Sequence, residues 1–331
     1  MAVSIEDIKK LRAMTGAGLA DVKKALTEAE GDFDKAKDLL RERGLAIAAK
    51  RSDRETSNGC VLVKKVGNFA AIIALKCETD FVANGADFIK LTSDILDAAI
   101  AAKAQTLDEV KALALGESDV QAAVTARSGI TGEKMELDGY CVLEGDNIEV
   151  YDHMNKHTLC TMVQLNENNE EAGHKVAMQV AAMRPVALDE SSVSEETKKT
   201  ELEVAVAKTK EELVEKAVNA ALKKAGINPA HVDSEEHIES NTKKGWLTPE
   251  QAEEARNIKK TVGEEKAATL NPTMIQNIAN GRLAKFFKEN CLVDQEFQFG
   301  DGDKQTVAQY LASQSKDLKI VAYQRFTLAA E

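Results

Sequence analysis

The chain has 331 residues, enough for two or three domains, and 44% of them are hydrophobic, so it can bury sizeable cores. Only 4% are aromatic, so those cores must rest on Ala, Val, Leu and Ile. The formal net charge of −12 argues against nucleic acid as the main partner, because phosphate binding requires clustered Lys and Arg.

The cysteines and the apolar segments indicate where the protein works. No segment approaches the ~20 apolar residues of a membrane span, and the N-terminus lacks the features of a signal peptide. The five cysteines are scattered and form no Cys-x-x-Cys pair, which favours a reducing compartment. We therefore expect a cytoplasmic protein that does not bind membranes.

Residues 1–50 are expected to form three short helices. Ser4 and Asp7 make a capping box before the first helix, and each helix carries a single apolar stripe. The three stripes should pack on one another as a small N-terminal domain. The polar stretch that follows, 51–58, is expected to be a linker.

The next segment predicts a strand pair followed by a helix. Strands are expected at 60–66 and 69–77, with a long helix at 86–102. Between them, Asp80 and Phe81 lie where a strand gives way to a helix. Two interpretations stay open from the residues alone. Either Asp80 caps the helix with Phe81 packed beneath it, or both side chains face a partner.

A similar order of strands and helix then returns. Residues 139–143 echo the strand that begins at Gly59, and further strands at 148–151 and 158–165 precede a helix at 171–183. This repetition predicts an α+β core of two related subdomains with antiparallel strands. Their predicted extents are 59–138 for the first subdomain, and 139–188 with 271–331 for the second.

Residues 189–270 differ from the core in composition. They are rich in Glu, Lys and Ala with apolar residues at near-helical spacing, and Thr248 to Gln251 form a capping box. We expect a helical insertion. Two interpretations stay open: a solvated, charge-laced helix pair without a role of its own, or a self-association element.

Two clusters could carry chemistry, and neither is convincing. His153 and His157 have the i, i+4 spacing of metal ligands, but the residues between them resemble a hairpin tip and no third ligand accompanies them. Cys77 and Asp80 could serve a hydrolase, yet nothing in the sequence brings a histidine to them. We expect no catalytic residues, no metal and no cofactor.

Two specific stretches resemble one family, that of translation elongation factor Ts. Residues 11–26 are similar to its N-terminal signature, and residues 79–83, Thr-Asp-Phe-Val-Ala, to its second signature. Their order and separation match as well. Gly281-Arg282 and Arg325-Phe326 also resemble the C-terminal part of the family.

The resemblance implies a fold, a partner and a set of contact residues. The fold is a ubiquitin-associated-type N-terminal domain followed by a core of two α+β subdomains. The partner is elongation factor Tu in its GDP-bound form. The implied contact residues are Thr79, Asp80, Phe81 and Val82 in the core, Arg12, Leu19, Ala20 and Lys23 in the N-terminal domain, and Gly132 and His153 further along the core.

The implied function is nucleotide exchange during translation elongation. Asp80 and Phe81 would intrude beside the magnesium and phosphate site of the GTPase and promote GDP release, so the protein would not be an enzyme. Two alternatives from other classes are a helical adaptor that binds only through residues 1–50, and a small hydrolase that uses Cys77 or Asp80.

Overall fold

The computed structural model describes residues 3–15, 17–300 and 304–329. Its contacts divide the chain into two compact units, one of residues 1–188 with 296–331 and one of residues 189–295. Each unit has buried hydrophobic residues of its own. The observed mixture of helices and antiparallel strands confirms the α+β prediction.

The first unit begins with the three predicted helices, α1 (Ile5–Thr15), α2 (Leu19–Glu28) and α3 (Phe33–Lys50). Ser4 and Asp7 form the expected start of α1, since the Asp7 amide donates to the Ser4 hydroxyl at 3.0 Å. Leu11, Val22 and Leu26 are fully buried between the helices. The apolar stripes therefore pack on one another as predicted.

Strand β2 (Phe69–Cys77) is the centre of the first unit. It pairs antiparallel with β1 (Asn58–Val66) on one side and with β5 (Met135–Glu144) on the other. Successive side chains of a strand point to opposite faces. Ile73 and Leu75 thus join one core cluster with Phe88, whereas Ile72 joins another. Burial on both faces explains why the strand is a continuous apolar run.

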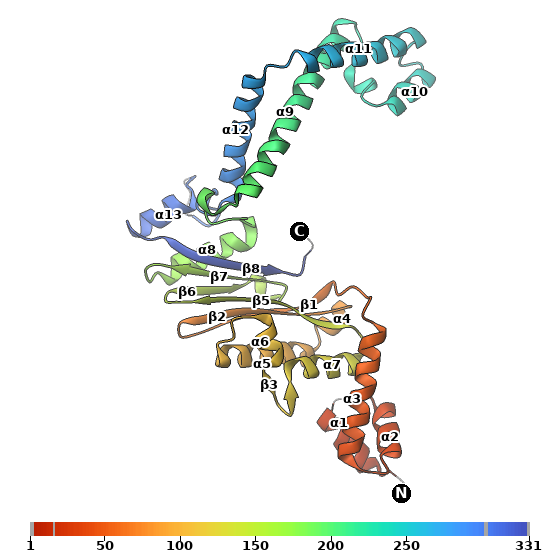
Figure 1. Ribbon diagram of the computed structural model, residues 1–331, viewed down its shortest axis with the longest axis vertical. Coiled ribbons are helices and arrows are strands. Elements are labelled where there is room, and N and C mark those ends of the chain that lie inside the picture. Colours follow the sequence, from red (N-terminus) through yellow and green to blue (C-terminus); the bar gives the residue numbers. More distant parts are fainter. Residues whose placement is uncertain (1–2, 16, 301–303, 330–331) are drawn as a thin grey trace. The chain divides into compact units, whose positions relative to one another are not determined.

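Helices cover one face of this sheet (Figure 1). A single turn of helix follows β2, then two longer helices, a short hairpin and a last helix. These elements are α4 (Asp80–Ala83), α5 (Ala86–Ala102), α6 (Leu107–Ala112), β3 (Ala114–Leu115), β4 (Ser118–Asp119) and α7 (Val120–Thr131). The predicted long helix at 86–102 is confirmed by α5.

A second antiparallel sheet packs on the other face of the first one. Residues of both sheets share a single buried cluster. The elements of this half are β6 (Ile148–Asp152), β7 (Leu159–Leu165), β8 (Ile320–Thr327), α8 (Glu170–Met183) and α13 (Val307–Gln314). Residues 139–143 are predicted to belong to this half, but they lie in β5, which pairs with β2 in the first sheet. The weak similarity of residues 139–143 to the strand that begins at Gly59 did not indicate which strand β5 would pair with.

The second unit is helical in its described residues. It contains α9 (Glu195–Lys224), α10 (Glu235–Lys243), α11 (Pro249–Ala268) and α12 (Pro272–Asn290). The predicted capping box of Thr248 and Gln251 opens α11. The residues of α12 are predicted to belong to the core, but α12 packs against α9 and lies in this unit. Its buried side chains, Ile275, Ala279 and Phe287, supply the contact face.

In the part of the chain that the structure describes, no helix is both long enough and apolar enough to cross a membrane.

Candidate interaction site at the strand–helix junction

The junction after β2 presents an aromatic ring to solvent. Residues 79–82, here called the tip, begin at the end of the strand and include most of α4. Phe81 is 88% exposed, and Asp80 is exposed as well. Val82 is partly buried against the core cluster, and Ala83 is buried. The turn of helix thus packs on the core through Val82 and Ala83 and exposes Asp80 and Phe81 to solvent.

This arrangement excludes one of the two interpretations of Asp80 and Phe81, and contact with a partner stays a prediction. Thr79, rather than Asp80, is the N-cap of α4, since its hydroxyl accepts the Val82 amide at 3.3 Å. Asp80 is the first residue of that helix, and Phe81 does not pack beneath it. The interpretation of Asp80 as the helix cap with Phe81 packed beneath it is therefore wrong. Aromatic residues, phenylalanine included, are enriched in protein–protein interfaces.

Glu133 fixes the start of the tip. Its carboxylate accepts the Thr79 amide at 3.1 Å and the Thr79 hydroxyl at 2.7 Å. On the other side, the Asn84 side-chain amide donates to the Asp80 carbonyl at 2.8 Å. Hydrogen bonds to a charged carboxylate are stronger than those between neutral groups. The backbone that carries Phe81 is therefore held at both ends.

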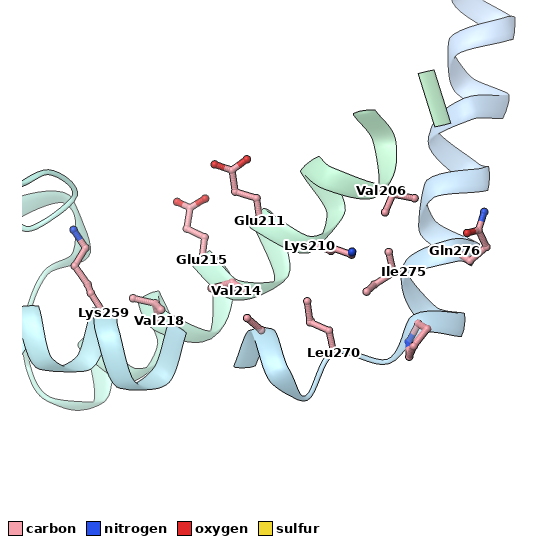
Figure 2. A pocket seen from close by; sticks show the side chains of 12 residues that line it. Val206, Lys210, Glu211, Val214, Glu215, Val218, Lys259, Leu270, Ile275 and Gln276 are labelled. Atoms are coloured by element: carbon pink, nitrogen blue, oxygen red, sulfur yellow. The ribbon is translucent and has the colours of Figure 1, made fainter. Parts of the chain in front are cut away.

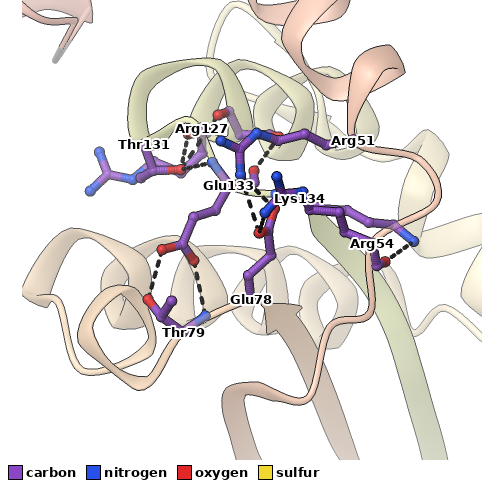
Figure 3. Close-up of polar contacts among 9 residues, drawn as sticks. Arg51, Arg54, Glu78, Thr79, Arg127, Thr131, Glu133 and Lys134 are labelled. Carbon is purple, nitrogen blue, oxygen red and sulfur yellow. Dashed lines mark hydrogen bonds and ion pairs between the residues drawn. The ribbon is translucent and has the colours of Figure 1, made fainter.

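Glu78, next to the tip, is the centre of a charged network (Figure 3). Its carboxylate accepts the Lys134 amide at 2.6 Å and pairs with Arg51 at 2.9 Å and Arg54 at 3.2 Å. The Lys134 amide, followed by Arg51 and Arg54, holds the pKa of this carboxyl below its ordinary value, although burial opposes the shift. Glu78 thus stays ionised and bound at neutral pH.

The network residues Glu78, Glu133, Arg51 and Arg54 were missed in the sequence analysis. The two arginines stand in the polar stretch predicted to be a linker, and Glu133 is more than fifty residues away from Thr79 along the chain. Charge complementarity alone could not have paired them, because the chain has many acids and bases. Only the fold brings them together.

Two further predicted contact residues lie in the first unit. Gly132 caps α7 with φ of 72°, a left-handed conformation that favours glycine, and places Glu133 directly after the turn. His153 opens a short turn between β6 and β7, where its Nδ1 lies 3.2 Å from the Tyr151 hydroxyl. His157, at the end of that turn, lines a cavity of about 300 Å³ that Asp80 also lines. The turn and the tip are thus neighbours.

The four predicted N-terminal contact residues are all exposed. Arg12 lies near the end of α1, and Leu19, Ala20 and Lys23 lie in the first turns of α2. Leu19 is an exposed large hydrophobic residue, 57% accessible. These side chains of the N-terminal bundle are accessible to a partner.

The structure does not favour hydrolase chemistry at Cys77 or a metal site at the histidines. Cys77 is fully buried, and burial raises the pKa of its thiol to about 12, so the nucleophilic thiolate is suppressed. His157 Nδ1 is 2.5 Å from Asp152, whereas His153 faces Tyr151. Within residues 3–15, 17–300 and 304–329, no group of three potential metal ligands is clustered.

The second unit has a groove of its own (Figure 2). It measures about 750 Å³ and lies among α9, α11 and α12. Its apolar floor is bordered by charged side chains, and its lining includes Val206, Val214, Val218, Leu270 and Ile275. Self-association through residues 189–270 stays a prediction, because nothing in the structure identifies what covers this groove.

The chain is similar to known proteins over its whole length. The sequence profile of the family described as Elongation factor TS matches residues 78–330. The chain is 62% identical to Elongation factor Ts of Bacteroides fragilis and 60% identical to that of Parabacteroides distasonis, over the full length of both chains in each case. It is 39% identical to that of Porphyromonas gingivalis, again over the full length of both chains.

Proposed function

Because the chain belongs to the elongation factor Ts family, whose members exchange nucleotides on elongation factor Tu, we propose that it binds elongation factor Tu–GDP in the cytoplasm and promotes GDP release. The GTPase holds GDP through phosphate contacts and a magnesium ion, and this ion is the largest local charge there. The tip would enter beside that site and displace the elements that coordinate the ion.

The observation that carries the proposal is the exposure of Phe81 on an anchored turn of helix. Phe81 is 88% exposed, while Thr79 is hydrogen-bonded to Glu133 of the core and the Asp80 carbonyl to the side chain of Asn84 at the end of the turn. An ordered backbone loses little conformational entropy when the ring enters a partner. An aromatic side chain can bury about 150–250 Å² there, which suits a wedge.

The proposed coupling is a matter of binding energy and needs no bond-making. By linkage, the chain weakens GDP binding by the same ratio by which GDP weakens binding of the chain. Asp80 would add negative charge near the phosphates or compensate a displaced hydrogen-bond donor. Arg12, Leu19, Ala20 and Lys23 would dock the N-terminal bundle on the same GTPase, with Gly132 and His153 as further contacts of the core.

Release of fluorescent GDP from purified elongation factor Tu tests the proposal. The wild-type chain should accelerate release in a concentration-dependent way. Val66→Ala is the matched control for Phe81→Ala. Val66 is also an exposed apolar residue, but it lies at the β1–β2 turn and not in the tip. It should release GDP like the wild type. A release rate that does not change when the wild-type chain is added would refute the proposed function.

A further inference from the structure

The segment between α3 and β1 is fastened to the core. The Thr56 hydroxyl donates to the Glu136 carboxylate at 2.8 Å, and Lys134 Nζ donates to the Arg54 carbonyl at 3.0 Å. At the start of β1, the Asn58 side-chain amide donates to the Glu78 carbonyl at 2.9 Å. Residues 51–57 are therefore a bound connection between the N-terminal bundle and the core, and not a free tether.

Arg51, Arg54 and Glu78 form the centre of this connection, here called the clamp (Figure 3). Arg51 Nη1 donates to both Glu78 oxygens, at 2.9 and 3.1 Å, and Arg54 Nη1 donates to one of them at 3.2 Å. The Glu78 side chain is only 12% exposed, so solvent and salt screen these pairs less than pairs on the surface.

The clamp residues lie next to the two predicted contact surfaces. Arg51 directly follows Lys50, the last residue of α3, and Glu78 directly precedes Thr79, the cap of α4. The clamp thus joins the end of the N-terminal bundle to the start of the tip, although the two are far apart along the chain.

A close helix crossing makes a second connection between the same two parts. Helices α3 and α7 meet at Gly44 and Gly129, where a Cβ on Gly129 would lie 2.3 Å from the Gly44 Cα atom. Helix α7 then ends at Gly132, and Glu133 binds Thr79. Helix α7 therefore touches the N-terminal bundle, and the residue that follows its cap binds the tip.

We propose that the clamp makes the N-terminal bundle and the tip one rigid, two-point binding element, with Glu78 as its positioning residue. The inference rests on the proposed function, in which both surfaces contact one GTPase. When two contacts are joined at a fixed span, the second one forms at a high effective concentration. Loss of the clamp should weaken overall binding without removing any contact residue.

The test compares two double variants of the full chain. Arg51→Gln with Arg54→Gln opens the clamp. Lys64→Gln with Lys90→Gln is the control, because it removes the same charge and two exposed ion pairs, to Asp97 at 2.6 Å and to Asp94 at 2.7 Å. Fluorescent GDP release is measured against the concentration of each variant. Hydrogen exchange of residues 51–57 reports the clamp itself, without elongation factor Tu.

The clamp variant should need about 3- to 10-fold more protein for half-maximal release, with little change in the maximal rate, because its contact residues are intact. Its residues 51–57 should exchange hydrogen faster, while the control should match the wild type in both measurements. Arg54→Gln alone, which keeps the Arg51 pair, should show a smaller change in the same direction and is less demanding on folding.

A double-mutant cycle separates coupling from general destabilisation. In a background of Arg12→Ala with Lys23→Ala, the N-terminal contact is weakened, so opening the clamp should change half-saturation by less than about twofold. Full additivity of the two effects would overturn the proposal, as would unchanged half-saturation despite faster hydrogen exchange. Failure of the wild-type chain to release GDP would instead overturn the proposed function.

Discussion

Phe81 in the tip and Phe88 in the following helix α5 differ in their exposure to solvent. Phe81 is 88% exposed, whereas Phe88 is fully buried in the core beneath β2. Truncation of a buried phenylalanine costs about 3–5 kcal/mol of stability. We therefore expect Phe88→Ala to lower the melting temperature strongly and Phe81→Ala to leave it nearly unchanged. Circular dichroism melting of the two variants gives the comparison.

The same pair distinguishes activity from folding. Phe81→Ala should reduce GDP release at saturating concentration although it stays folded. Phe88→Ala should lose activity only in proportion to the unfolded fraction. If the folded Phe81→Ala protein released GDP as fast as the wild type, the ring would not be the wedge.

Cys77 tests the hydrolase alternative. Its thiol is buried and its pKa is raised to about 12 by burial, with the Glu133 carboxylate as a smaller cause, so thiolate is scarce at neutral pH. We expect a thiol reagent to modify native Cys77 far more slowly than the unfolded chain. Cys77→Ser should leave GDP release unchanged, and a loss of activity in a fully folded Cys77→Ser protein would speak for a chemical role.

Glu78 predicts how the clamp responds to acid. Its pKa is lowered by the Lys134 amide, then by Arg51 and Arg54. Since the folded-state pKa lies below the unfolded value, its stabilising contribution is present above the unfolded pKa and is lost as pH falls through the folded pKa. The melting-temperature difference between wild type and Glu78→Gln should thus be constant near neutral pH and shrink in acid. A difference that grew in acid would contradict the assigned sign.

At the scale of elements, local patterns could be predicted, including the hairpin of β1 and β2, whereas contacts between distant segments could not. The apolar run of β2 and the helix start at Thr248 are encoded within a few residues, so the sequence indicates them directly. The neighbour of β5 and the helix that α12 packs against depend on contacts between distant segments. The anchor of the tip by Glu133 belongs to the same class. Phe81 was predicted as a contact residue from the resemblance to a family. Its exposure to solvent could be established only from the structure.

The helical unit gives a prediction about boundaries. Ile275, Ala279 and Phe287 of α12 are buried, and α12 packs on α9. Replacing 189–295 by a Gly/Ser linker should therefore leave a folded protein that still releases GDP. Replacing only 189–270 would strip α9 from α12 and should cause aggregation, which light scattering detects. Equal behaviour of both deletions would mean that α12 does not need α9.

At the scale of the whole molecule, the described residues combine an exposed ring, an anchored backbone and a bound connection to a second contact surface. None of these parts performs chemistry in the proposed function. Together they would convert binding energy from docking into a change at the nucleotide site of the partner. Such coupling must be reciprocal, which makes it measurable at equilibrium.

The most direct measurement is this reciprocity. The dissociation constant of the chain is measured for nucleotide-free and GDP–magnesium-loaded elongation factor Tu, and that of GDP with and without saturating chain. The account predicts that both ratios are equal and about 5- to 150-fold for the wild type, and closer to one for Phe81→Ala. A GDP affinity that is unchanged in the complex with the wild-type chain would contradict the account.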